Sequence, residues 1–100
     1  MSYHIFFNLD IEPLDEEIYD ESVNYSAESK YALSQDKACE WEDHEKLLKY
    51  LSKKRPTFLY ILQGEGESNG DMWIKYFKGG KMQFAPANIT FDIFDETRLK

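Results

Sequence analysis

The chain has 100 residues, of which 42% are hydrophobic and 16% aromatic, enough apolar material for one folded core and too much for a disordered chain. Its single cysteine, Cys39, excludes an internal disulfide, and its net charge of −7 disfavours direct binding to phosphate groups. The longest apolar run is far shorter than a membrane span and the N-terminus lacks the features of a signal peptide, so we expect a single-domain, cytoplasmic protein that does not enter a membrane.

The acidic residues are concentrated in the first third of the chain. Residues 1–29 contain eight Asp and Glu and no Lys or Arg, whereas residues 30–100 contain eleven acids and twelve bases. Because a field of one sign attracts surfaces of the opposite sign, the first third is predicted to bind a basic protein. The candidate partner-binding residues are Asp10, Glu12, Asp15, Glu16, Glu17, Asp20 and Glu21.

The chain is expected to begin with a strand over residues 3–9, because alternate residues there form an apolar face. The members of that face are Tyr3, Ile5, Phe7 and Leu9.

Residues 10–35 allow more than one interpretation. Pro13, the acids that follow it and the four-residue spacing of Leu14 and Ile18 favour a helix. The alternative is a strand over residues 17–25, with Tyr19, Val23 and Tyr25 on one face. The polar and small residues 26–35 favour a loop or an edge strand.

The clearest helix is predicted over residues 36–54. Ser34 or Asp36 can cap its start and Pro56 ends it. Acids in its first half and lysines in its second half match the helix dipole, which also accounts for the basic run Lys53–Arg55. Its apolar stripe, which predicts packing on one face of a sheet, consists of Trp41, His44, Leu47, Leu48 and Leu51.

Three strand patterns follow in residues 57–85. The first, Phe58–Leu62, is apolar on both faces and is predicted to be a central strand. Gly79-Gly80 predicts a two-residue hairpin turn that pairs Lys78 with Lys81. In this register the face toward the helix consists of Trp73, Lys75, Phe77, Met82 and Phe84, with the Lys75 amine in water. The other face consists of Ile74, Tyr76, Lys78, Lys81, Gln83 and Ala85.

A last strand is predicted over residues 88–94, because Ile89, Phe91 and Ile93 occupy alternate positions, and these three side chains are expected to point inward. Segregated helix and strands make the expected fold class α+β: a mainly antiparallel sheet of four to six strands with one main helix, residues 36–54, on one face.

The loop between the second and third expected strands resembles the first half of a calcium-binding loop. Glu65, Glu67, Asn69 and Asp71 alternate, and a glycine follows Asn69. The position that should supply a bidentate glutamate is Tyr76, so a solvated hairpin loop is favoured over a metal site. A secondary surface is nevertheless assigned to Glu65, Glu67, Asp71 and an exposed Tyr76 beside the hairpin lysines.

No catalytic, metal-binding or cofactor-binding set is predicted. His44 and His4, the two histidines, are forty residues apart, and His44 is expected at the border of the core, adjusted by Glu40 or by a backbone group. Cys39 and His44 diverge on a helix, which disfavours a nucleophile–base pair.

Three functions are compatible with this pattern. The favoured one is a non-catalytic, acidic protein-binding module, such as an inhibitor, an immunity protein or an anti-defence protein, that covers a basic partner. The second is a mimic of nucleic acid, in which carboxylates replace phosphates. The third is a small metal-binding protein or hydrolase that uses the loop from Glu65 to Asp71.

Overall fold

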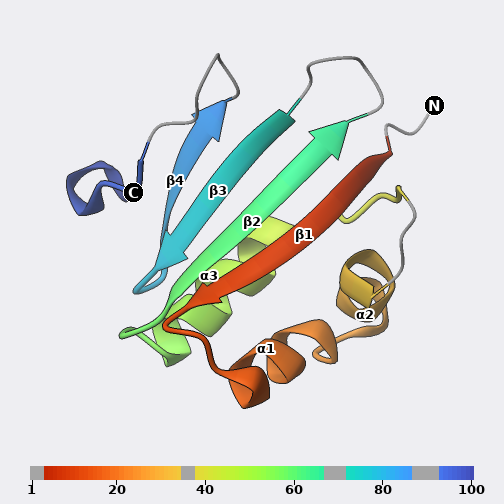
Figure 1. The fold of residues 1–100 in the computed structure, drawn as a ribbon, viewed down its shortest axis with the longest axis horizontal. Coiled ribbons are helices and arrows are strands. Elements are labelled where there is room, and N and C mark those ends of the chain that lie inside the picture. The colour runs from red at the N-terminus through yellow and green to blue at the C-terminus, as the bar shows by residue number, and fades with distance from the viewer. Residues whose placement is uncertain (1–3, 35–37, 67–71, 87–92) are drawn as a thin grey trace.

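The elements follow one another in the order β-α-α-α-β-β-β. The computed structural model describes residues 4–34, 38–66, 72–86 and 93–100. The elements are β1 (Ile5–Glu12), α1 (Glu16–Val23), α2 (Ala27–Ser34), α3 (His44–Lys54), β2 (Leu59–Gly66), β3 (Met72–Lys78), β4 (Lys81–Pro86) and a 3-10 helix (Glu96–Arg98). These strands form an antiparallel sheet in the order β1-β2-β3-β4. In Figure 1, α3 lies across one face of the sheet, and α1 and α2 lie beside β1. The fold is α+β, as predicted.

The alternation of apolar and polar residues in β1 decides which face enters the core. Phe7, Leu9 and Ile11 are buried, and the residues between them are exposed. The prediction is confirmed for Phe7 and Leu9, and the strand continues further than expected, to Glu12. The predicted face member Tyr3 lies outside the described residues.

The β3–β4 hairpin has the predicted register. Gly79 and Gly80 adopt φ values of 62° and 82°, which side chains disfavour, and Lys78 pairs with Lys81. Phe77 is therefore opposite Met82, and both contact the core beneath α3. Phe84 belongs to the same face but is 46% exposed, because it lies in the outer strand of the pair.

The main core lies between the sheet and the helices. Leu48 and Leu51 of α3 and Phe77 of β3 have no exposed surface. Complete burial of such side chains contributes about 1.5–3 kcal/mol each. The buried members of this core are Phe7, Leu9, Ile11, Ile18, Ala32, Cys39, Trp41, Leu47, Leu48, Leu51, Tyr60, Leu62 and Phe77.

Residues 10–35 contain two helices. The helical interpretation of the acidic segment is correct, because α1 spans Glu16–Val23, and the alternative strand is wrong. The loop or edge strand expected over 26–35 is also wrong, because α2 begins at Ala27. The hydroxyls of Ser26 and Ser29 each accept a hydrogen bond from the other residue's N–H, at 3.1 and 3.0 Å, which caps this helix. The fully buried residues of α2 are the small Ser29 and Ala32, so its apolar periodicity is weak.

The third helix starts later than predicted. α3 begins at His44, with Asp43 at the N-cap position, and not near residue 36. Before it, Cys39 exchanges two backbone hydrogen bonds of 2.9 Å with Ile5 at the outer edge of β1. Trp41 precedes the helix yet is buried in the core, since it packs edge-on against Phe7 at 5.3 Å.

The opposite face of the sheet carries a smaller apolar cluster. Tyr76, predicted to be exposed, is buried to 8% exposure with Leu59 and Ala85, and its ring contacts Phe94 at 5.5 Å. The C-terminal segment therefore covers part of this face. Ile93, expected to point inward, is 85% exposed, and residues 93–95 form no strand. The remainder of the predicted last strand, 88–92, lies outside the described residues.

Candidate functional site

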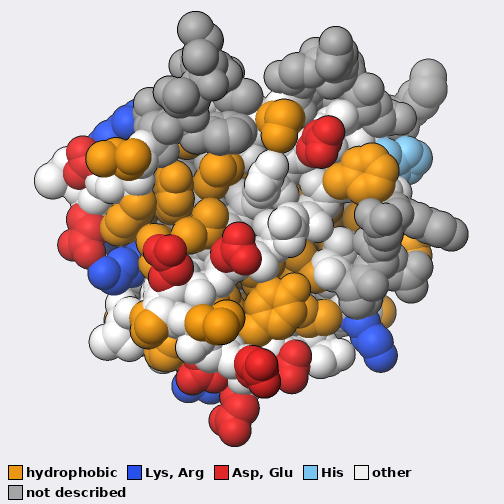
Figure 2. Space-filling view, in the orientation of Figure 1, with side chains coloured by type: hydrophobic (Ala, Val, Ile, Leu, Met, Phe, Trp, Pro, Cys, Tyr) orange, Lys and Arg blue, Asp and Glu red, His pale blue; other side chains and the backbone are white. Residues whose placement is uncertain are grey.

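Two of the predicted partner-binding residues lie on β1. Asp10 and Glu12 are exposed, because they alternate with the buried Leu9 and Ile11. They belong to the sheet face that does not pack against α3. Figure 2 shows acidic side chains on this face and along the margin of the sheet where α1 lies.

The sequence around α1 determines which of its acids face solvent. Asp15 is the N-cap, and its carboxylate accepts a hydrogen bond of 3.1 Å from the N–H of Ile18. Ile18 is buried, so the residues on the opposite side of the helix must face solvent. At 100° per residue, Glu16, Glu17 and Asp20 fall within an arc of about 100°, and all three are exposed.

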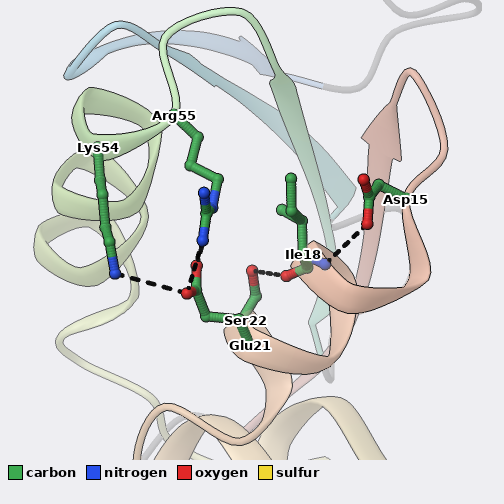
Figure 3. A network of polar contacts seen from close by, with 6 residues as sticks. All are labelled: Asp15, Ile18, Glu21, Ser22, Lys54 and Arg55. Carbon is green, nitrogen blue, oxygen red and sulfur yellow. Dashed lines mark hydrogen bonds and ion pairs between the residues drawn. The ribbon is translucent and has the colours of Figure 1, made fainter.

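Glu21 lies apart from these carboxylates and is paired inside the protein. Its carboxylate accepts hydrogen bonds from Arg55 Nε at 3.2 Å and Nη2 at 3.0 Å, and Lys54 Nζ lies 3.5 Å away (Figure 3). The hydrogen bond from Arg55 is the largest cause that holds the pKa of Glu21 below its ordinary value. These contacts join the end of α3 to α1. Of the predicted partner-binding residues, Glu21 therefore serves this junction and Asp15 caps α1. The other five acids are exposed: Asp10, Glu12, Glu16, Glu17 and Asp20.

The predicted helix included Leu14, but α1 begins two residues after it. Leu14 is 82% exposed and lies between Glu12 and the start of α1. We call the acids and this residue the acidic surface: Asp10, Glu12, Leu14, Glu16, Glu17 and Asp20. Within the described ranges, none of its carboxylates forms an ion pair with a base.

The secondary surface predicted around the β2–β3 loop is only partly described. Glu65 is exposed in β2, opposite Phe6 and Met72. Glu67 and Asp71 lie outside the described residues, and Tyr76 is buried, as stated above. Among the described residues, no group of carboxylates, histidines or cysteines is arranged to hold a metal ion.

The lysines near the β3–β4 hairpin do not form one basic patch. Lys75 points toward α3, and Lys78, on the other face, forms an ion pair of 2.6 Å with Glu96. The Lys75 amine was expected in water, but its side chain is only 11% exposed and its Nζ lies 2.6 Å from a carboxylate oxygen of Glu45. An amine that is buried away from water requires such a partner, because an unpaired buried charge is strongly destabilising.

Lys75 also fixes the tautomer of His44. Its Nζ lies 2.7 Å from His44 Nε2, and His44 Nδ1 lies 2.5 Å from the Trp41 carbonyl oxygen. An ammonium group only donates and a carbonyl only accepts, so Nδ1 carries the proton and Nε2 accepts. His44 is stacked on Trp73, with ring centroids 5.6 Å apart. The Trp41 carbonyl is a backbone group that contacts His44, which is one of the two arrangements predicted for this histidine.

Acidification below about pH 6.5 is expected to destabilise the fold through His44. Burial, the largest cause, and the neighbouring Lys75 amine hold the pKa of His44 below its ordinary value. The unfolded chain therefore binds a proton at a higher pH than the folded chain does. The free energy of unfolding keeps this contribution above about pH 6.5 and loses it as the pH falls toward the pKa of His44 in the folded protein. A second loss follows below about pH 4.5, because the hydrogen bond from Lys75 lowers the pKa of Glu45.

Urea unfolding at about pH 7.5 and about pH 5.5 measures this loss. The variant His44→Gln, which keeps an acceptor for Lys75, should show a smaller difference between the two pH values than the unmodified protein. His4→Gln removes the other histidine and is the matched control, which should retain the difference. A full difference in His44→Gln would show that another group is responsible.

A groove that the sequence did not predict lies between the start of α2 and α3. Tyr25 and Tyr50 form one side, with ring centroids 5.9 Å apart, and each is about half exposed. Buried Trp41 and Leu47 lie beneath, and the volume is about 340 Å³. We call this the tyrosine groove. Because Tyr25 alternates with Val23, the sequence also allowed a strand there. The strand interpretation did not place Tyr25 just after the end of α1, where it lies.

None of the described helices is long and apolar enough to cross a membrane. Comparisons with protein-family models, with curated protein sequences and with solved structures found no match.

Proposed function

We propose that this protein is a non-catalytic binding module that binds a basic protein through its acidic surface. The observation that carries the proposal is that five carboxylates of β1 and α1 are exposed and, within the described residues, unpaired, with the exposed Leu14 between the two elements in the chain. Such a concentration of like charge costs stability through self-repulsion, and no base among the described residues forms an ion pair with it. A partner that brings lysines and arginines to this surface removes the repulsion.

The two components of the surface support association in different ways. The carboxylates accelerate encounter with a cationic partner and select against acidic ones. Leu14 supplies an apolar contact, and complete burial of a leucine contributes about 1.5–3 kcal/mol. This combination fits a small inhibitor that covers a cationic site, such as an immunity or anti-defence protein acting in the cytoplasm. The free, buried Cys39 is compatible with that reducing compartment.

Affinity capture from cells that naturally contain the protein tests the proposal. The unmodified protein should retain a basic protein, and the affinity of the purified pair should fall as salt rises. The variant Glu16→Gln/Glu17→Gln/Asp20→Asn should bind at least about tenfold more weakly, because it loses three charges of the surface.

The matched control neutralises three exposed acids elsewhere, Glu40→Gln/Glu42→Gln/Glu65→Gln. Both triple variants have the same net charge, so a difference between them reports position and not total charge. Equal binding by the two variants, or capture of an acidic partner whose affinity ignores salt, would contradict the proposal.

A further inference from the structure

We infer that the tyrosine groove binds an arginine side chain of the basic partner. The inference rests on the proposed function for the identity of the partner, but the groove itself can be tested alone. Tyr25 lies two residues after the end of α1, so the groove begins where the helix of the acidic surface ends.

The aromatic side of the groove suits a planar cation. Tyr25 and Tyr50 are 51% and 52% exposed, which leaves ring surface open to a ligand. Their planes are inclined at 55°, so they form an open corner and not a closed stack. A guanidinium group is planar, weakly hydrated and stacks on aromatic faces, whereas a lysine ammonium does not stack.

The carboxylates of the groove suit the same ligand. Glu28 and Asp43 both line it, and both are exposed. Asp43 stands at the N-cap of α3 but makes no side-chain capping hydrogen bond, so its oxygens remain available. A carboxylate can accept two parallel N–H bonds from a guanidinium, which gives direction as well as charge.

Lys46 is the feature of the groove that opposes a cation. It also lines the groove. In the described part of the chain, the cation–π contacts belong to Lys75, so the Lys46 amine does not occupy the tyrosine corner. Two acids and one base leave the groove with a net negative charge. Removal of Lys46 should therefore strengthen binding of a cation.

The test is a nuclear magnetic resonance titration of the full chain with the peptide acetyl-Gly-Arg-Gly-amide. Its matched probe replaces arginine by citrulline, which has nearly the same shape and no charge. The arginine peptide should shift the amide signals of Tyr25, Glu28, Asp43 and Tyr50, with a dissociation constant of about 1–10 mM. The citrulline peptide should bind at least about tenfold more weakly.

Three variants decide whether the groove is the binding site. Tyr50→Leu should weaken arginine binding about three- to thirtyfold. Lys46→Gln should strengthen it about twofold or more. Tyr31→Leu changes a tyrosine of similar exposure that does not line the groove, and should leave binding unchanged. Equal binding of the two peptides, or signal shifts outside the groove, would overturn the inference.

The failures of the two proposals are distinguishable. If the groove ignores arginine while the triple acidic variant loses the partner, only the inference about the groove fails. If the groove binds arginine while the acidic variant keeps full affinity for the partner, only the assignment of the acidic surface fails.

Discussion

Replacement of Phe77 by alanine is expected to lower the free energy of unfolding by about 3–5 kcal/mol. Phe77 has no exposed surface and lies in β3, with Tyr60 and Met82 as its neighbours across the two adjacent strands. Its ring belongs to the core beneath α3, so its removal leaves a cavity that the surrounding strands cannot close. A domain of this size has a total stability of about 5–15 kcal/mol, so the loss is a large part of it.

The control for Phe77 is one strand away on the same face. Phe84→Ala removes the same ring from β4, where the side chain is 46% exposed, and should cost less than about 1 kcal/mol. The two variants are compared by urea unfolding, with tryptophan fluorescence as the signal. Similar losses in both would show that the core beneath α3 does not distinguish these positions.

Substitution of Gly64 by alanine is the second large effect, expected to cost about 1–3 kcal/mol. A Cβ atom there would overlap Cζ2 and Cε2 of Trp73, which faces Gly64 across β2 and β3. The indole cannot move aside cheaply. It is also stacked on His44, and its ring centroid lies 4.3 Å from the Lys75 amine, so its displacement disturbs both His44 and Lys75, which contact each other at 2.7 Å.

A double-mutant cycle tests the origin of this cost. In a Trp73→Leu background the clash is absent, and Gly64→Ala should cost at least about 1 kcal/mol less than in the unmodified protein. The cycle is measured by urea unfolding of the four proteins. An equal cost of Gly64→Ala in both backgrounds would mean that the loss arises in the backbone of β2 and not from contact with the indole.

The β3–β4 hairpin shows how far local information reaches. Gly79 and Gly80 accept positive φ, and this turn fixes the pairing of β3 with β4. The faces predicted from that register placed Phe77 and Met82 in the core, as observed. The alternation in β1 was equally sufficient, because both features depend on residues that are neighbours in sequence.

The acidic third of the chain shows what charge counting misses. Eight acids without a base predicted a single surface, and Glu16, Glu17 and Asp20 do share an exposed arc. Glu21 is next to them in sequence, but one residue further around α1 it meets Arg55. Only the tertiary fold, which places the end of α3 beside α1, brings a base from thirty-four residues away.

A second kind of error concerns the depth of burial, at Lys75, Tyr76 and Phe84. The pattern assigned each to the correct face, but a face does not state how deeply a position is covered. The C-terminal segment buries Tyr76 with Phe94, and Glu45 and His44 of α3 enclose the Lys75 amine. Phe84 stays half exposed at the outer strand. Coverage depends on elements that lie far away in sequence.

The sequence by itself determined the α+β class, the hairpin register, the buried face of β1 and the concentration of acids in the first third, because each follows from local periodicity, turn chemistry or composition. Tertiary structure decided where α3 begins, that residues 27–34 form a helix, which acids remain unpaired and where Tyr25 meets Tyr50. The reason is physical: burial and ion pairing depend on the distance between segments, and that distance is set only when the helices pack against the sheet.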